Sequence, residues 1–281
     1  MLRRIRLPLF LVFVLLVQLA WTHWHTPPAP LPPAPVAAPS DVPPADNGPV
    51  AASDVACGRN LYQGAQPVLP PKMAQGLTLV CYQGYASASS SITRTPLWSA
   101  EHLTARRVRL ARATERTNAF YPEPSLEPAA RGELIDYRRS GFDRGHLSPS
   151  GDMAGHEEQR QSFSLANIAP QNSDLNRGPW ADLEGRLRDF VERQGDVWVV
   201  TGVLFQGERI NTTPDGRVMV PTAFWKAAMV PAQDGAGGAV VFLASNDDSG
   251  TIERLSLADF TRRTGIAPFP RLAQAGTLEM D

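Results

Sequence analysis

The apolar residues of this chain recur with two alternating periods, and this alternation limits the fold more than any other feature. A period of two is typical of strands, and a period of about 3.6 is typical of helices. The strand period covers residues 77–82, 90–99, 198–205, 218–230 and 239–244, with a weaker match at 137–142. The helical period covers residues 157–165 and 176–193. Because short Gly-rich turns separate consecutive strands, the pattern predicts an α+β fold with a central antiparallel sheet flanked by helices.

The helix predicted over residues 176–193 has a defined start, apolar face and end. Its apolar face consists of Trp180, Leu183, Leu187, Phe190 and Val191. Asn176 is suited to the N-cap, Pro179 to the first turn and Gly195 to the C-terminal end. Helical side chains lean toward the N-terminus, so the carboxylate of Glu184 is expected to point back toward Asn176.

Two global features disfavour whole classes of function. No Gly-rich loop joins a strand to a helix, which disfavours a doubly wound nucleotide-binding fold. The formal net charge is −1 over 281 residues, whereas tight nucleic-acid-binding proteins are commonly basic because phosphate neutralisation supplies most non-specific affinity. A role in coating or storing DNA is therefore disfavoured, while an enzyme that must release its substrate is compatible with the charge.

The first 53 residues are expected to lie outside the folded domain. Three arginines precede an apolar run over residues 7–21, which is the order found in export signals and in short membrane anchors. Residues 26–53 are rich in Pro and Ala and predict a disordered linker. We expect a signal peptide or membrane anchor over residues 1–25, a linker over 26–53, and one domain over 54–281. The protein is then periplasmic or extracellular, with membrane anchoring through residues 1–25 as an alternative.

The chain has only two cysteines, Cys57 and Cys81, both near the start of the expected domain. In an exported chain a single pair favours a disulfide, which over this loop length contributes about 3 kcal/mol. The alternative is a buried Cys81 on a strand and a free Cys57.

Two segments carry the residues best suited to catalysis. Gly141-Phe-Asp-Arg-Gly-His-Leu-Ser-Pro-Ser150 places His146 at the expected exit of a strand. Asn167-Ile-Ala-Pro-Gln-Asn-Ser-Asp-Leu-Asn176 leads into the long helix that carries Glu184. Taken one at a time, a histidine is by default structural and an asparagine before a helix is by default a cap. The ordered set, with strand, loop and helix between its members, is what indicates a site.

These residue types suit the hydrolysis of a phosphodiester with a metal ion. A histidine with an unperturbed pKa of about 6.5 can take a proton from water, which assigns that task to His146. The amide oxygen of Asn176 is a hard ligand, and Mg²⁺ usually keeps several waters and takes only one or two protein ligands. Glu184 can order one of those waters. Arg144 and Arg116 can form paired hydrogen bonds with phosphate oxygens.

At these residues the sequence resembles the DNA/RNA non-specific endonucleases of the ββα-metal type, the family that includes mitochondrial endonuclease G. The matching segments are Asp143-Arg-Gly-His146, Asn167-Ile-Ala-Pro-Gln171, Asn176 and Trp180-Ala-Asp-Leu-Glu184. Weaker similarity covers most of the chain after residue 53. The resemblance implies that residues 54–281 form one endonuclease domain with a ββα-metal catalytic motif.

The resemblance also implies a role for each matching residue. His146 corresponds to the general base and Asn176 to the single protein ligand of Mg²⁺, with Mn²⁺ as an alternative metal. Glu184 corresponds to a glutamate that holds water of the metal, and Asn167 to an asparagine near the metal or the base. By order along the chain, Arg116 matches an arginine that steadies the phosphate. Asp143 is interpreted as orienting its neighbours, and Arg144 as a phosphate contact.

The predicted substrates are DNA and RNA, cut with little sequence preference, because contacts to phosphate and metal carry no base information. The oligomeric state stays open, with a homodimer as one candidate. Two alternatives remain: a catalytically inactive nucleic-acid-binding module, or a cell-surface interaction module, each with the same fold. A serine hydrolase using Ser148 or Ser150 is disfavoured, because no Gly-x-Ser-x-Gly segment is present.

Overall fold

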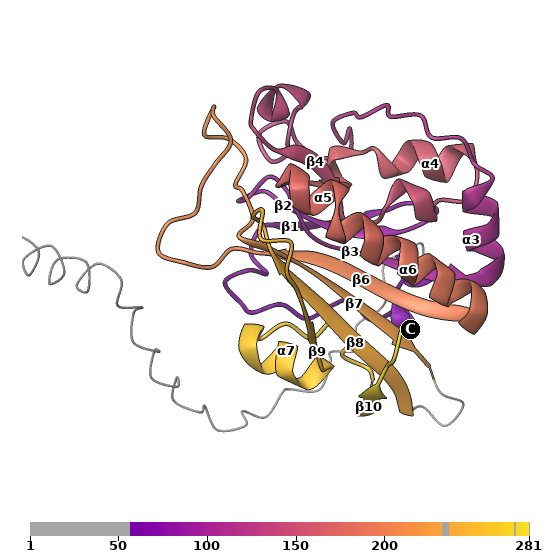
Figure 1. Ribbon diagram of the computed structural model, residues 1–281. Coiled ribbons are helices and arrows are strands. Elements are labelled where there is room, and N and C mark those ends of the chain that lie inside the picture. The colour runs from indigo at the N-terminus through magenta and orange to yellow at the C-terminus, as the bar shows by residue number, and fades with distance from the viewer. Residues whose placement is uncertain (1–56, 232–235, 273, 281) are drawn as a thin grey trace, which may run out of the picture. The chain divides into compact units, whose positions relative to one another are not determined.

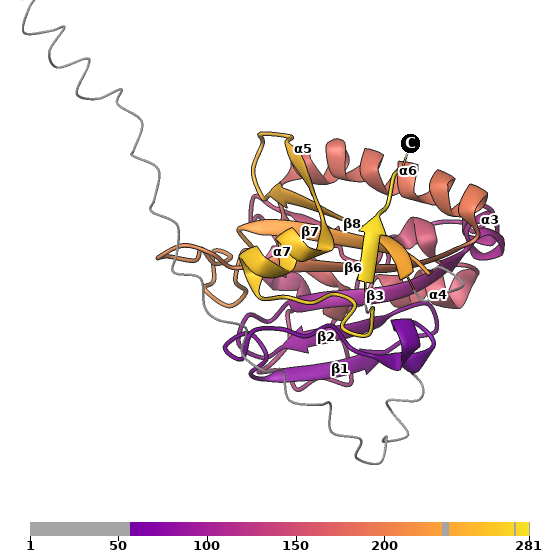
Figure 2. The same ribbon diagram turned by 90° about the horizontal axis from the view of Figure 1, so that it is seen from below.

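The computed structural model describes residues 57–231, 236–272 and 274–280. Its main element is an eight-stranded sheet, with strand order β1-β2-β3-β6-β7-β8-β10 and β9 paired to β8 (Figure 2). All neighbours in this sheet are antiparallel except β8 and β10. The strands are β1 (Leu77–Cys81), β2 (Ala86–Ser90), β3 (Pro96–Thr104), β6 (Asp196–Leu204), β7 (Ala223–Val230), β8 (Ala236–Ser245), β9 (Ile252–Leu255) and β10 (Gln274–Thr277).

Helices cover both faces of this sheet, with α4, α5 and α6 on one side and α7 on the other (Figure 1). The α-helices are α3 (Ala105–Arg112), α4 (His156–Ser162), α5 (Ser173–Arg177), α6 (Pro179–Gln194) and α7 (Leu257–Thr264). Short 3₁₀ turns are η1 (Tyr62–Gly64), η2 (Leu134–Tyr137), η3 (Ser150–Asp152) and η4 (Leu165–Asn167). The predicted α+β class with a central antiparallel sheet and flanking helices is confirmed.

Strand β7 shows how the two faces of the sheet differ. Trp225 packs toward α7, with its ring centroid 5.1 Å from that of Phe260. The next residue, Lys226, points to the opposite face because side chains alternate along a strand. Phe224 also lies on that opposite face, 6.0 Å from the ring of Trp180 on α6. The face under α6 therefore combines apolar packing with a buried lysine.

A separate two-stranded sheet, β4 (Asp143–His146) with β5 (Ile168–Gln171), lies on the α6 side. Its close pairing depends on Gly145, where an added Cβ would lie 2.6 Å from the Cβ of Gln171. The chain runs from β5 into α5 and α6. This order of two strands and a helical segment brings the end of β4 close to the start of the long helix.

Several strand boundaries differ from those predicted. Residues 90–99 are not one strand, because Ser90 Oγ accepts hydrogen bonds from the backbone amides of Ile92 and Thr93 and closes a turn. Residues 137–142 are not a strand either: they follow the 3₁₀ turn η2 and pass through Arg139 at a positive φ of 58°. Strand β7 begins only at residue 223, after Pro221, which cannot donate to a ladder.

The start of the long helix was also predicted wrongly. Asn176 does not cap it but lies inside α5, whose N-cap is Asn172. Gly178 separates α5 from α6 with φ −106° and ψ −113°. A Cβ there would lie 2.7 Å from the carbonyl oxygen of Asp174, so glycine is required. The apolar face and the end at Gly195 are as predicted.

Cys57 and Cys81 form a disulfide, which joins the N-terminal part of the described domain to β1. The expected signal or anchor (1–25) and the whole of the expected linker (26–53) lie outside the described residues. Within the part of the chain that the structure describes, no helix is both long and apolar enough to cross a membrane.

Replacing both cysteines with serine is expected to lower the free energy of unfolding by about 3 kcal/mol, because the bond closes a loop with a sequence separation of 24. Urea unfolding of the double variant beside the wild type measures this difference. An unchanged unfolding midpoint would contradict a stabilising bridge.

Candidate active site

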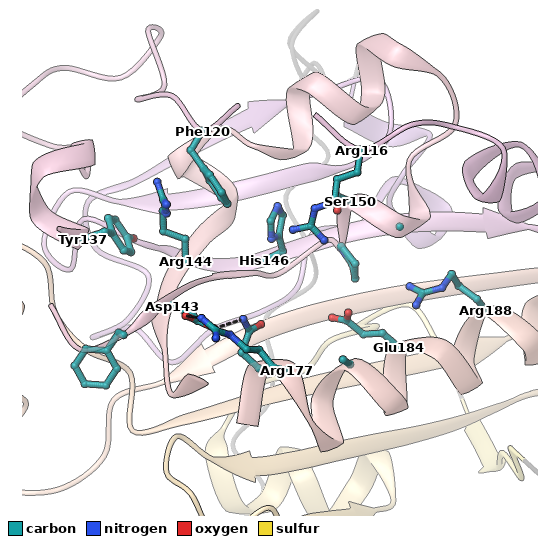
Figure 3. A pocket seen from close by; sticks show the side chains of 15 residues that line it. Arg116, Phe120, Tyr137, Asp143, Arg144, His146, Ser150, Arg177, Glu184 and Arg188 are labelled. Atoms are coloured by element: carbon teal, nitrogen blue, oxygen red, sulfur yellow. Dashed lines mark hydrogen bonds and ion pairs between the residues drawn. The ribbon is translucent and has the colours of Figure 1, made fainter. Parts of the chain in front are cut away.

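A cavity of about 560 Å³ lies between β4 and the helices α5 and α6 (Figure 3). His146, Arg144 and Arg116 line one side of it, and Glu184 and Arg188 project from α6 on the other. The remaining lining residues are Phe120, Tyr137, Phe142, Asp143, Pro149, Ser150, Gly151, Asn176, Arg177 and Ala181. Five of the six residues predicted for the site therefore share one cavity.

His146, the last residue of β4, has an apolar setting. The ring centroids of Phe163 and Phe120 lie 5.1 Å and 5.5 Å from the imidazole centroid. Nε2 is buried and has no hydrogen-bond partner among the described residues. Burial, followed by the positive charges of Arg116 and Arg144, lowers the pKa of His146 to about 3. The imidazole is therefore neutral at pH 7, and its pKa lies well below the ordinary value near 6.5.

Asp143, the first residue of β4, fixes the orientation of Asn176. Its carboxylate accepts hydrogen bonds from Asn176 Nδ2 at 2.9 Å and from Arg177 Nε and Nη2 at 2.7 Å and 2.6 Å. Burial raises the pKa of Asp143, but the hydrogen bonds from Arg177 and Asn176 outweigh it, so the pKa lies below its ordinary value. Because a carboxylate only accepts, the amide nitrogen of Asn176 must face Asp143. The amide oxygen is left available to the cavity.

The donor set at this cavity fits a hydrated divalent cation better than an enclosed metal site. Among the described residues, no three His, Cys, Asp or Glu side chains are grouped to hold a metal. The cavity offers instead the oriented amide oxygen of Asn176 and the carboxylate of Glu184. Mg²⁺ commonly keeps several waters and takes one or two protein oxygens. Asn176 would be the direct ligand, and Glu184 would hold a water.

Glu184 and Arg188 occupy successive turns of the same face of α6. Burial raises the pKa of Glu184 to about 7, although Lys226 opposes the shift. Arg188 donates from Nη1 to Asp152 Oδ1 at 2.9 Å, and the Asp152 side chain is buried. This ion pair holds one guanidinium group of the cavity in place.

The cavity lining is positive, although the whole chain is close to neutral. Four arginines (Arg116, Arg144, Arg177 and Arg188) line it, against two carboxylates (Asp143 and Glu184). The guanidinium carbon of Arg144 lies 4.3 Å from the ring centroid of Phe120, and that of Arg116 lies 5.6 Å from that of Phe163. The aromatic rings that bury His146 thus also support the two arginines beside it.

Asn167 is the predicted site residue that does not line the cavity. Its side chain is fully buried. Oδ1 accepts from the backbone amide of Ser148 and from Ser99 Oγ, both at 2.9 Å. Nδ2 donates to the carbonyl oxygens of Ser148 and Ser162 at 2.8 Å and 3.0 Å. Asn167 therefore anchors the loop that follows His146, and it does so from outside the cavity.

Sequence reasoning missed three charged residues that belong to this region. Arg188 could have been found from its spacing of four residues from Glu184 on one helix face. Arg177 adjoins Asn176. Lys226 is the single charged residue in the otherwise apolar strand β7, and a lysine in a buried strand is unusual enough to attract attention.

The two strands β4 and β5 and the helical segment that follows them bring a histidine, an asparagine and a glutamate to one arginine-rich cavity. This arrangement defines a ββα-type site. The sequence family described as DNA/RNA non-specific endonuclease matches residues 67–275. The chain belongs to this family.

Known proteins share both sequence and fold with this chain. Nuclease EXOG, mitochondrial, of Danio rerio is 32% identical over 211 residues, which is 68% of this chain and 60% of that protein. Nuclease C1 of Cunninghamella echinulata var. echinulata is 33% identical over 206 residues, or 68% of this chain and 82% of that protein. The crystal structure of the EndoG/EndoGI complex, described as showing the mechanism of EndoG inhibition, contains a chain that matches with a TM-score of 0.62 and 26% identity, covering 75% of this chain and 97% of that one.

The imidazole of His146 is expected to stay neutral from pH 8 down to about pH 4 in the metal-free protein, because its pKa is about 3. Since the unfolded chain takes this proton first, near its ordinary pKa of about 6.5, His146 lowers the stability of the fold increasingly as the pH falls from about 6.5 toward 3. NMR titration of the ring resonances, assigned with a His146→Gln variant, measures the pKa. A midpoint above about pH 5 would contradict this environment.

Proposed function

We propose that this protein is a metal-dependent endonuclease that hydrolyses phosphodiester bonds of DNA and RNA with little sequence preference. The observation that carries the proposal is the joint placement of His146, Asn176 and Glu184 on one arginine-rich cavity. Membership of the endonuclease family supports the same activity.

The arginines and His146 divide the work of hydrolysis. Arg116, Arg144 and Arg188 bind the phosphate oxygens and hold the scissile bond beside the imidazole. The imidazole of His146 accepts a proton from the attacking water, whose oxygen bonds to phosphorus while the bond from phosphorus to the leaving nucleoside oxygen breaks. A bound phosphate offsets the positive charges that help to lower the pKa of His146. Substrate binding therefore makes the imidazole a stronger base.

Asn176 and Glu184 serve the metal, with Mg²⁺ as the proposed ion and Mn²⁺ as the alternative. Asn176 would hold the cation through the amide oxygen that Asp143 leaves available, and Glu184 would hold one of its waters. When bound, the cation neutralises charge that grows on the phosphoryl and leaving oxygens. Asp143 keeps the amide orientation throughout.

Low sequence preference follows from what the cavity offers to a nucleic acid. Guanidinium groups and a metal contact phosphate, and the phosphate group is the same at every nucleotide of a nucleic acid. Among the described residues, the cavity contains no Asn or Gln side chain other than Asn176, whose amide nitrogen is already bonded to Asp143. We therefore propose that the protein cleaves both DNA and RNA at many different sequences.

Digestion of plasmid DNA and of RNA with Mg²⁺, and again with EDTA, tests this activity. We expect EDTA to abolish cleavage and His146→Ala to reduce it at least 10³-fold, since loss of the base alone accounts for about 10²–10⁴ and positioning is lost with it. Asn176→Ala is expected to raise the Mg²⁺ concentration needed for half-maximal activity, with an unchanged circular dichroism spectrum.

His156→Ala is the matched control, because His156 is exposed at the start of α4 and lies outside the cavity. It should cleave like the wild type. Binding of nucleic acid without cleavage by the wild-type protein would favour the inactive-module alternative. Neither binding nor cleavage would favour a cell-surface interaction module.

We also propose export to the periplasm or the cell exterior, with residues 1–25 acting as the signal or as a membrane anchor. The Cys57–Cys81 disulfide supports an oxidising compartment. Fractionation of cells that express the full chain with a C-terminal tag distinguishes the two alternatives. Recovery of soluble protein in the periplasm or medium identifies a cleaved signal, and recovery with membranes identifies an anchor. Recovery in the reduced cytosol would contradict export.

A further inference from the structure

Lys226 is almost completely buried, with 1% of its surface exposed. It lies in the middle of β7, paired with Thr201 on β6 and with Phe242 on β8. Its side chain points to the face of the sheet that α6 covers. A buried amino group is costly unless each of its N–H bonds finds a partner, so its contacts show what it does.

The amino group of Lys226 contacts three different parts of the fold. Nζ donates to Thr201 Oγ1 at 2.6 Å, within the sheet. It donates to the carbonyl oxygen of Leu147 at 3.3 Å, one residue beyond His146. It forms an ion pair with Glu184 Oε1 at 3.9 Å, on α6. The sheet, the end of β4 and α6 therefore meet at one nitrogen atom.

A second buried acid, Glu101 on β3, lies on the same face of the sheet, but it does not replace Glu184 as the partner of Lys226. Glu101 is 1% exposed, and neither of its carboxylate oxygens has a hydrogen-bond partner among the described residues. Burial and the charge of Asp152 raise its pKa well above the ordinary value. Glu101 accepts no hydrogen bond from Lys226, so the carboxylate that pairs with Lys226 is that of Glu184, which faces the cavity.

We propose that Lys226 is a positioning residue of the active site, which holds the His146 loop and the Glu184 carboxylate at a fixed separation through contacts to both. This inference rests on the proposed nuclease function. His146 and Glu184 lie on opposite sides of the cavity. A displacement of about 1 Å between reacting groups can lower a rate about 10²-fold. Lys226 does not line the cavity and acts through its contacts to Leu147 and Glu184.

A merely structural lysine would give a different result from a positioning one. Loss of a structural contact lowers stability and leaves the surviving folded enzyme unchanged. Loss of a positioning contact lowers kcat of the folded enzyme and leaves KM for nucleic acid nearly unchanged. The loss of kcat on removing such a lysine is also smaller in a protein whose Glu184 has already been replaced.

The test is a double-mutant cycle of Lys226→Met and Glu184→Gln in the full chain, with plasmid DNA and Mg²⁺. We expect Lys226→Met to lower kcat about 10²-fold. We expect the combined loss to be at least about fivefold smaller than the product of the two single losses. A combined loss within fivefold of that product would overturn the proposal.

Arg131→Met is the matched control for removal of a well-paired cation. Arg131 donates to the carbonyl oxygens of Glu123 and Leu126 and to the carboxylate of Glu133, and it does not line the cavity. This variant should lose stability and keep kcat. A similar kcat loss in both variants would assign Lys226 to the structure alone.

NMR provides a readout that does not require activity. The ring resonances of His146 should shift in Lys226→Met and stay unchanged in Arg131→Met; unchanged resonances in both would overturn the proposal. If wild-type protein cleaves no nucleic acid, the proposed function fails, and this measurement still decides whether Lys226 positions the His146 loop. Should Lys226→Met not fold, Thr201→Val removes the 2.6 Å contact and the same cycle and resonances are measured with it.

Discussion

Polar groups buried on one face of the main sheet hold the segments on the two sides of the cavity, and the arrangement of the candidate site depends on this. A polar group removed from water must find a partner inside the fold. Ser99 meets this requirement by donating to Asn167, which holds both backbone polar groups of Ser148. Lys226 meets this requirement by donating to the carbonyl oxygen of Leu147 and by pairing with the carboxylate of Glu184. The residues on either side of the cavity are thus tied to the main sheet, because the sheet would carry unsatisfied polar groups without them.

The electrostatics of the site are local. A chain with a formal net charge of −1 has no general attraction for a polyanion, yet its cavity carries four guanidinium groups against two carboxylates. Interactions between exposed charges fade beyond about 10 Å in ordinary salt. In the proposed function, the arginines therefore act on a phosphate that has reached the cavity. The same charges, together with burial, keep His146 neutral.

Sequence patterns predicted which residues lie together at the cavity better than they predicted the contacts that support them. His146, Asn176, Glu184, Arg116 and Arg144 share the cavity, because motif and order along the chain carry that information. Asn167 was recognised, but its place behind the loop depends on a hydrogen bond from Ser99, 68 residues away. Such contacts leave no local pattern. The turn at Ser90 and the break at Gly178 were missed because side-chain hydrogen bonds and a glycine conformation override apolar periodicity.

The break at Gly178 means that Asn176 and Glu184 lie on two separate helices, α5 and α6. On one continuous helix, residues 176 and 184 would be related by a fixed rotation of about 80°. Here α5 is oriented by Asp143 on the small sheet, whereas α6 is packed on the large one. Changes in the packing of either sheet can therefore alter the distance between the Asn176 amide and the Glu184 carboxylate independently. A designer could alter the junction at Gly178 to change that distance and leave both helices intact.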